Sequence, residues 1–569
     1  MLHIPINEQG WGLFVQLIRN LTRSDVGGKA VALFVTLTVL LFATNGLNVL
    51  NSYVGRDFMT AIANRETTTY LREAAIYLGV FAASTVVAVL IRYAEESLGI
   101  LWRQWMTQRF VELYLQYPTY YRMNDAVIRN SGMEHPDQRI ADDVRTFTTT
   151  TLSFALMLMN GLFTIVAFSG VLWRISPTLF MVAVGYAVFG SLLTVWLGGA
   201  LIDLNHAQLD KEATFRSGLL HISERAESVA LLHREKPLLR RLLMRLDDLA
   251  GNFRKIVKVN RNLGFFTTAY NYLVQVLPIL LVAPLYMRGE VDFGVVTQSV
   301  MAFTTLVAAF SLIITQFQSI SSFAAVVQRL INLWYAVELA QTETVSGIDW
   351  TESDDRVAFE NLTLRSTTDG HTLVRELSAS IPQGKRTLIT AIDDAAKDAI
   401  FKATAGILDI GRGRVFRPRL SRVLFLPERA YLPPGTLREA LVSAGEPGSV
   451  DDETLIATLR SLGIESVLAR TGGLDKEQEW ETLLTFNEQY MLSFARILIA
   501  SPPFTVINLP SADLNPERIR LMLAQLSAAG ISYLVIGRPG QQNTEEQRRS
   551  YDAVLEIELD GGWAWQSAA

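Results

Sequence analysis

The chain has 569 residues, 50% of them hydrophobic, and a mean hydropathy of +0.23. This is too long for one ordinary domain and too apolar for a typical soluble protein, so we expect a membrane portion and at least one further domain. Because the chain has no cysteine, disulfides and cysteine metal sites are excluded. Its six histidines form no metal-binding motif, and its net charge of −5 does not predict nucleic-acid binding.

The chain begins with an amphipathic run from Trp11 to Leu21 that lacks the features of a signal peptide. We interpret residues 1–27 as a segment at the membrane interface. Six apolar stretches follow, each long enough for a bilayer core, which needs about 20 residues. The sequence therefore predicts a six-helix transmembrane domain over residues 28–340. The stretches cover roughly 30–54, 74–91, 150–173, 178–201, 264–287 and 295–317.

Basic residues concentrate in the two long connections between spans, residues 92–149 and 202–263. By the positive-inside rule these connections face the cytoplasm, together with both ends of the chain. Their helical periodicity predicts helices that continue beyond the membrane. A soluble core of the same hydrophobicity is the alternative, and six spans with this charge asymmetry argue against it.

Polar side chains recur at regular spacing within two of the spans. Asn45, Asn48 and Asn51 are three residues apart in the first span, and Asn271 and Gln275 are four apart in the fifth. Each spacing places its members on one side of a helix. They either line a transport path or form hydrogen bonds between helices, and the sequence leaves both interpretations open.

Carboxylates lie just beyond the second and fourth spans. A carboxyl group that titrates in a restricted environment can couple transport to a proton gradient, and we consider Glu212 the first candidate. The alternatives are a plain ion pair between Arg92 and Glu96 and a solvated charged face on the helix after the fourth span. The full set of candidates is Glu95, Glu96, Glu212, Glu224 and Glu227.

Residues 341–356 are polar and are interpreted as a linker. Beyond them, strand-like runs alternate with helical runs, which predicts an α/β domain on a largely parallel sheet over residues 357–569. The strand-like runs are 357–359, 387–390, 423–426, 505–507 and 533–536, and the helical runs are 453–462, 488–500 and 516–528.

A loop in this domain occupies the position of a phosphate-binding loop, between an apolar strand and a helix. A G-x-x-x-x-G-K-[ST] loop needs glycines so that backbone N–H groups approach the phosphates, and a hydroxyl for Mg²⁺. Here Lys397 is present, but Ala391 and Ala396 replace the glycines and Asp398 replaces the hydroxyl.

The same loop carries two more carboxylates, on Asp393 and Asp394. They lie at the positive end of the following helix, which would otherwise attract a phosphate. We therefore expect the loop to exclude ATP, and we expect Lys397 to be a solvated lysine at a helix end.

Short strings in both halves of the chain carry a resemblance to a known family. The strings are Leu101–Thr107, Tyr120–Arg122, His135–Asp143, Glu212–Arg216, Glu224–Ser228, Leu424–Glu428 and Pro434–Ala440. They resemble ABC transporter halves with fused permease and nucleotide-binding domains, and most closely the SbmA/BacA-like family with its YddA type. The resemblance implies six ABC-exporter-like helices, an ABC-type nucleotide-binding domain, and the bacterial inner membrane as location.

The ATPase motifs of that family are altered in this chain. Loss of one positioned catalytic group costs about 10² to 10⁴ in rate, and phosphoryl transfer depends almost entirely on positioning and electrostatics. We therefore expect a pseudo-ATPase without catalytic residues that uses neither ATP nor Mg²⁺. The altered positions are Glu428 for the glutamine loop, Phe486 and Asn487 for the signature glycines, Asn508 and Leu509 for the Asp-Glu pair, and Arg538 for the switch histidine.

Some members of the resembled family lack the ATPase domain and use the proton gradient. The resemblance thus implies an ATP-independent, proton-coupled homodimer in the lipid bilayer that imports peptides or bulky hydrophilic solutes such as cobalamin. One alternative is an ATP-driven half that works with a competent partner subunit. The other is a membrane receptor or scaffold that does not transport.

Overall fold

The computed structural model describes residues 19–123, 136–312, 316–341, 347–366, 369–408, 410–442, 450–510, 514–538 and 551–567. Within it the chain forms two compact units, Met1–Gln341 and Thr342–Ala569, and each is described by itself. Most of the predicted interfacial segment, residues 1–18, lies outside the described residues, so its position at the membrane remains a prediction.

The first unit is helical, because its apolar stretches are long and lack interior helix breakers apart from Pro278 and Pro284. Six of its helices, counted over the described residues, are long and apolar enough to cross a membrane, as the sequence predicts. Its elements are α2 (Gly27–Ala63), α3 (Thr67–Leu115), α4 (Thr119–Arg122), α6 (Pro136–Gln138), the π-helical turn η1 (Arg139–Asp143), α7 (Val144–Ile175), α8 (Pro177–Gly198), α9 (Ala200–Glu224), α10 (Ala226–Leu232), α11 (Glu235–Met287), α12 (Phe293–Phe310) and α14 (Phe317–Gln341).

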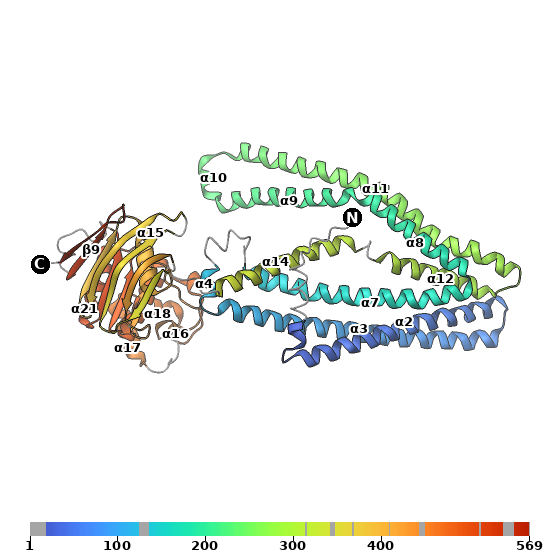
Figure 1. Ribbon diagram of the computed structural model, residues 1–569, viewed down its shortest axis with the longest axis horizontal. Coiled ribbons are helices and arrows are strands. Elements are labelled where there is room, and N and C mark those ends of the chain that lie inside the picture. Colours follow the sequence, from blue (N-terminus) through green and yellow to red (C-terminus); the bar gives the residue numbers. More distant parts are fainter. Residues whose placement is uncertain are drawn as a thin grey trace. The chain divides into compact units, whose positions relative to one another are not determined.

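Several of these helices are longer than a bilayer is thick. Helices α3 and α11 have 49 and 53 residues, whereas about 20 suffice for the hydrocarbon core. The additional turns carry the long connections of the sequence beyond the membrane-spanning part. Figure 1 shows α9 and α11 as the two arms of one such extension, joined by α10.

Two apolar cores hold the helical unit together. One joins α2, α3, α7 and α14 through buried residues such as Leu41, Trp102 and Phe147. The other joins α7, α8, α11 and α12 around Phe168 and Phe303. Helix α7 contributes to both cores and therefore links the two halves of the unit.

The second unit contains two sheets. The larger has the order β10-β9-β4-β8-β7-β6, and all neighbours in it are parallel except β9 and β10. The smaller has the order β1-β5-β2-β3. The strands are β1 (Ile348–Glu352), β2 (Arg356–Arg365), β3 (Thr372–Pro382), β4 (Arg386–Ala391), β5 (Gly411–Arg417), β6 (Val423–Leu426), β7 (Phe504–Asn508), β8 (Ser532–Gly537), β9 (Ala553–Ile557) and β10 (Trp563–Ser567).

The helices of this unit bury the faces of its sheets. Helix α15 packs its apolar face into a core shared by both sheets, and most other helices contribute to a second core on the larger sheet. The α/β prediction is thereby confirmed. The helices are α15 (Asp394–Ala405), α16 (Leu437–Leu441), α17 (Asp452–Ser461), α18 (Ser466–Thr471), α19 (Trp480–Leu483), α20 (Phe486–Ala500) and α21 (Pro516–Ala528).

The start of the second unit differs from the sequence prediction. Residues 341–356 were interpreted as a linker, but β1 lies inside this range and pairs in parallel with β5. Its sequence, Ile-Asp-Trp-Thr-Glu, is polar at alternate positions because β1 is an edge strand with one wet face. Polar composition alone could not distinguish such a strand from a linker.

Candidate functional site

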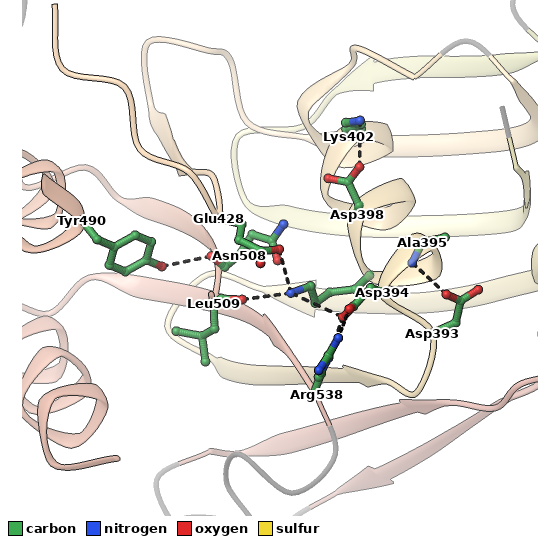
Figure 2. Close-up of polar contacts among 11 residues, drawn as sticks. Asp393, Asp394, Ala395, Asp398, Lys402, Glu428, Tyr490, Asn508, Leu509 and Arg538 are labelled. Carbon is green, nitrogen blue, oxygen red and sulfur yellow. Dashed lines mark hydrogen bonds and ion pairs between the residues drawn. The ribbon is translucent and has the colours of Figure 1, made fainter. Parts of the chain in front are cut away.

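The carboxyl ends of four parallel strands meet at one edge of the larger sheet. Strands β4, β8, β7 and β6 are consecutive neighbours with the same direction. The residues that follow them in the chain therefore gather at this edge, where open α/β sheets bind their ligands. They include Asp394 after β4, Arg538 after β8, Leu509 after β7 and Glu428 after β6 (Figure 2).

Lys397 occupies the centre of this edge. It lies in the first turn of α15 and its side chain is 0% exposed. Its Nζ donates to Glu428 Oε2 at 3.0 Å and to the main-chain oxygen of Leu509 at 3.0 Å, and it lies 3.9 Å from Asp394 Oδ1. The expectation of a solvated lysine is therefore wrong, because strand ends that converge around the helix start enclose the side chain.

The three aspartates of the loop are each engaged by a neighbour. Asp393 is the N-cap of α15 and accepts from the main-chain N–H of Ala395. Asp394 pairs with Arg538, whose Nε donates to Asp394 Oδ1 at 2.7 Å. Asp398 pairs with Lys402 at 2.7 Å, one helical turn away. Two of the three carboxylates, those of Asp394 and Asp398, are thus paired with a cation (Figure 2).

The two alanines at the glycine positions are buried in the domain core. Ala391 is 0% exposed and Ala396 is 2% exposed, and both belong to the core shared by the sheets and α15. Both side chains therefore pack in the apolar core of the domain. The sequence did not show that these two positions are buried, and it treated both methyl groups as part of an exposed loop.

Asn508 closes the site on the side of β7. It is 1% exposed, and its Oδ1 has no hydrogen-bond partner among the described residues. Its main-chain oxygen accepts from the hydroxyl of Tyr490 at 3.0 Å. Burial, and secondly the charge of Glu428, raises the pKa of Tyr490 well above its usual range, so this phenol stays a donor. A buried unsatisfied amide oxygen is an available ligand for a hard cation.

The positions of the signature loop begin α20. Thr485 and Glu488 form a capping box at this helix start, and Arg470 pairs with Glu488. Phe486 and Asn487, which replace the signature glycines, lie half-buried in the first turn. Asn487 Oδ1 lacks a partner among the described residues. The structure does not bring these two side chains to Lys397 through any hydrogen bond that it records.

The polar stripe of α2 is divided between two environments. Asn45 is 3% exposed, donates to Asn160 Oδ1 at 2.8 Å and accepts from Thr164 Oγ1 at 2.8 Å, both on α7. Asn48 and Asn51 are half-buried, and Asn51 Oδ1 has no partner among the described residues. For Asn45 the geometry favours helix–helix hydrogen bonding, one of the two interpretations left open.

The polar pair of α11 is exposed. Asn271 and Gln275 both lie on the outside of the single chain although the surrounding span is apolar. A polar side chain that contacts lipid raises the free energy of the folded protein. We therefore expect this face to line a water-filled transport path or to contact another protein surface. The pair remains a candidate for lining a path.

The proton-coupling candidates are exposed or half-buried in this chain. Glu212 accepts from Gln208 at 3.1 Å on α9 and is exposed, as are Glu224 and Glu227. Glu95 is half-buried, and Glu96 pairs with Arg92 at 3.1 Å on an exposed face. The plain ion pair considered for Arg92 and Glu96 is therefore present. The single chain does not give these carboxyls the restricted environment that proton coupling requires.

Sequence reasoning missed two contacts between distant residues. Arg329 forms a two-pronged pair with Asp143 at 2.6 and 2.7 Å and ties η1 to α14. Tyr186 and Tyr270 stack with ring centres 4.3 Å apart, and each hydroxyl donates to the other residue's main-chain oxygen. No spacing rule links residues so far apart; only Arg329, the one basic residue of α14, could have suggested the first pair.

Comparisons with known proteins agree with this architecture. Residues 17–287 match the family described as ABC transporter transmembrane region 2. An ABC transporter ATP-binding protein of Synechocystis is 33% identical, with 93% of this chain and 80% of the relative aligned. The chain belongs to the ABC transporter family. The chloroplastic ABC transporter D family member 2 of Arabidopsis thaliana is 32% identical over 93% of this chain and 84% of its own length.

More distant relatives also align over most of their length. The inner membrane ABC transporter ATP-binding protein YddA of Escherichia coli is 23% identical, covering 92% of this chain and 95% of the relative. The lysosomal cobalamin transporter of Mus musculus is 25% identical over 82% and 81%. The predicted resemblance to ABC transporters with a fused ATP-binding domain, the YddA type included, is confirmed. The narrower SbmA/BacA assignment stays a prediction.

The prediction of a pseudo-ATPase without ATP or Mg²⁺ is wrong. The Synechocystis relative and YddA align across both units and are named ATP-binding proteins. The sequence argument treated each substitution as an isolated loss. In the fold, both alanines lie in the core, and Asp394 and Asp398 are paired with cations, so the reasons for excluding ATP are weaker than the residue types suggest.

The residues at the sheet edge fit a nucleotide with its metal. Lys397 supplies a cation beside the N-terminus of α15, where a phosphate is favoured, and Asn508 Oδ1 supplies an unsatisfied oxygen for Mg²⁺. In that arrangement Lys397 would contact phosphate oxygens and Asn508 would hold the metal, while the metal itself would neutralise phosphate charge.

Proposed function

We propose that this protein is an ATP-dependent transporter of the bacterial inner membrane, built from two copies and moving a bulky hydrophilic solute. The observation that carries the proposal is the buried Lys397 at the meeting point of four strand ends, in a chain of the ABC transporter family. The inner-membrane location is supported by the name of YddA. Both chain ends are expected in the cytoplasm, from the basic connections.

The cargo is inferred from the polar surfaces of the helical unit. Asn271 and Gln275 expose amides on a membrane-spanning helix. A hollow of about 560 Å³ on α9 is lined by both charged and apolar residues, namely Leu209, Glu212, Ala213, Arg216, Ser217, Leu220, His221 and Glu224. Such a lining suits a solute with amides, both charges and apolar surface. A peptide or a cobalamin-like molecule fits that description, and one relative is named a cobalamin transporter.

Proton coupling is not part of this proposal. Glu212 is exposed in the single chain and accepts a hydrogen bond from Gln208, and proton coupling requires a restricted environment that this position lacks. The receptor alternative is likewise set aside, because the family relationship is to transporters.

The test is transport in proteoliposomes that contain the purified full-length chain. Mg-ATP is supplied on the side of the α/β domain, with and without an imposed pH gradient, and labelled cobalamin and a labelled peptide serve as cargo. ATP-dependent movement of either cargo supports the proposal. Movement driven by the pH gradient without ATP, or no movement under any condition, contradicts it.

A further inference from the structure

Four charged side chains alternate in sign across the candidate nucleotide site. Arg538 binds Asp394, Asp394 lies 3.9 Å from the amino group of Lys397, and Lys397 binds Glu428 at 3.0 Å. The two positive groups come from the end of β8 and the start of α15. One carboxylate, that of Asp394, therefore lies between two cations, and Figure 2 shows its contact with Arg538.

Stability does not explain the ion pair between Arg538 and Asp394. The side chains of Arg538 and Asp394 are 43% and 44% exposed, and an exposed ion pair contributes about 0–1 kcal/mol. An exposed ion pair elsewhere on the domain would stabilise the fold equally well. This pair instead lies beside Lys397, within reach of any anion that Lys397 receives.

A phosphate chain would compete with the two carboxylates. Its oxygens prefer the same partners, a guanidinium with forked donors and a buried ammonium. To reach Lys397, a phosphate must replace Glu428 or Asp394 as its acceptor. If the phosphate replaces Asp394, that carboxylate moves away from Arg538 as well. The guanidinium of Arg538 then has no carboxylate partner from Asp394 and lies next to the phosphate.

We propose that Arg538 is a second phosphate-binding cation beside Lys397, and that Asp394 and Glu428 occupy the two cations until nucleotide replaces them. This inference rests on the proposed function and specifies its nucleotide site. Arg538 thus supplies N–H donors to the phosphates, which a loop with glycines would supply from its backbone. The two carboxylates compete with the nucleotide and so set the nucleotide concentration at which the site fills. No bond is made or broken in this exchange.

Two substitutions break the same pair and are expected to act in opposite directions. Asp394→Asn frees Arg538 for phosphate, so Mg-ATP and inorganic tripolyphosphate should bind about five- to tenfold more tightly. Arg538→Met removes the cation, so both ligands should bind about five- to tenfold more weakly. Calorimetry on the full-length protein in nanodiscs measures both affinities. Asp354→Asn is the matched control, because Asp354 forms an ion pair of similar exposure with Arg422, just before the start of β6, and the affinity of this variant should stay within about twofold of wild type.

A nucleotide-free measurement checks that the variants are comparable. Arg538→Met breaks only the pair with Asp394, whereas Asp394→Asn also removes the carboxylate charge 3.9 Å from Lys397, so both melting temperatures without ligand should fall slightly, and that of Asp394→Asn by at least as much. Glu428→Gln removes the carboxylate that pairs with Lys397, and it should also tighten the binding of Mg-ATP and tripolyphosphate. It keeps the shape of Glu428 and remains informative if an Asp394 variant folds poorly.

The outcomes separate this inference from the proposed function. If the wild type binds Mg-ATP and the two variants shift affinity in the same direction, or do not shift it, Arg538 is only structural and the inference is wrong. A shift in Asp354→Asn as large as in Asp394→Asn also overturns it, since the effect would then come from the net charge of the domain and not from Arg538. If neither the wild type nor any variant binds ATP or tripolyphosphate, the ATP-dependent function and the inference both fail.

Discussion

Lys397 is a buried cation whose partners come from two other strand ends. Burying an ammonium is tolerable only when its donors are used, and here they reach Glu428 and the main-chain oxygen of Leu509. The side chain therefore has a structural role in the absence of nucleotide as well as a place in the proposed site.

Lys397→Met should destabilise the nucleotide-free domain by about 1–3 kcal/mol, because the oxygens of Glu428 and Leu509 lose a charged donor. For a domain of this size this corresponds to a melting temperature lower by roughly 2–10 °C, measured by thermal unfolding of the full-length protein. Lys402→Met is the control. Its pair with Asp398 is more exposed, so a loss as large as that of Lys397→Met would contradict the assigned role.

Asp552 joins the starts of β9 and β4 and makes stability depend on pH. It accepts from the main-chain N–H and the guanidinium of Arg386 at 2.9 Å. These bonds, first that of the guanidinium, lower the pKa of Asp552 below its usual range. A carboxyl with a lowered folded-state pKa contributes stability that is present above its ordinary pKa and is lost as the pH falls through the lowered value.

Asp552→Ala should therefore cost about 0.5–1 kcal/mol at pH 7, a value reduced by partial exposure of the pair. The difference from wild type should shrink as the pH falls below about 4. Hydrogen exchange of β4 and β9 at pH 7 and thermal unfolding across this range measure it. A difference that grows toward acid would contradict the assignment.

At the scale of elements, α12 approaches α2 through a glycine. The main-chain N–H of Gly294 donates to Thr60 Oγ1 at 3.1 Å, and an added methyl would lie 1.9 Å from the main-chain oxygen of Arg56. That oxygen belongs to a helix backbone and cannot move aside alone. The close contact of the two helices therefore depends on the missing side chain.

Gly294→Ala should destabilise the helical unit by about 1–3 kcal/mol, as expected for overpacking. The loss of folded protein on heating in nanodiscs is the measurement. Gly170→Ala is the matched control in α7, because an added methyl there meets nothing within 4 Å. Equal stability of the two variants would show that α2 and α12 do not pack as described.

The polar residues of α2 and α11 should differ in effect. Asn45→Ala removes hydrogen bonds between α2 and α7 and should lower stability by about 0.6 kcal/mol, with little change in transport. The double substitution Asn271→Ala and Gln275→Ala, on an exposed face, should reduce transport and leave stability unchanged. Parallel melting and uptake measurements compare them. The reverse pattern would place the path at Asn45.

At the scale of the whole molecule, the tip of the α9–α11 extension exposes apolar residues. Leu231 and Leu232 at the end of α10 are 75% and 67% exposed in the single chain. Large exposed apolar side chains in a group indicate an interaction surface, which agrees with the proposal of two copies.

The absence of cysteine makes this proposal directly testable. Mass photometry of the protein in nanodiscs should give twice the mass of one chain, after subtraction of the disc. A single Leu232→Cys variant with a spin label should lose label mobility in the assembled protein relative to a labelled exposed site such as Glu227→Cys. A single-chain mass, or equal mobility of both labels, would contradict the two-copy arrangement.

The sequence by itself determined the membrane spans and the positions of five strands along the chain. Runs of about 20 apolar residues are recognisable because a bilayer has a fixed thickness, and fully buried parallel strands such as β8 contain a continuous apolar run, Tyr533–Ile536. Strand β1 was missed, because a strand with one wet face has the composition of a loop.

Only the tertiary structure decided what the altered site contains. The sequence placed Lys397 on the surface and treated Asp394 and Asp398 as free charges, whereas convergence of four strand ends buries the lysine and pairs both carboxylates. Likewise both alanines lie in the core. Residue types state which groups are present, but charge pairing and side-chain direction depend on contacts between segments more than 100 residues apart, such as Asp394 and Arg538, and no local pattern encodes them.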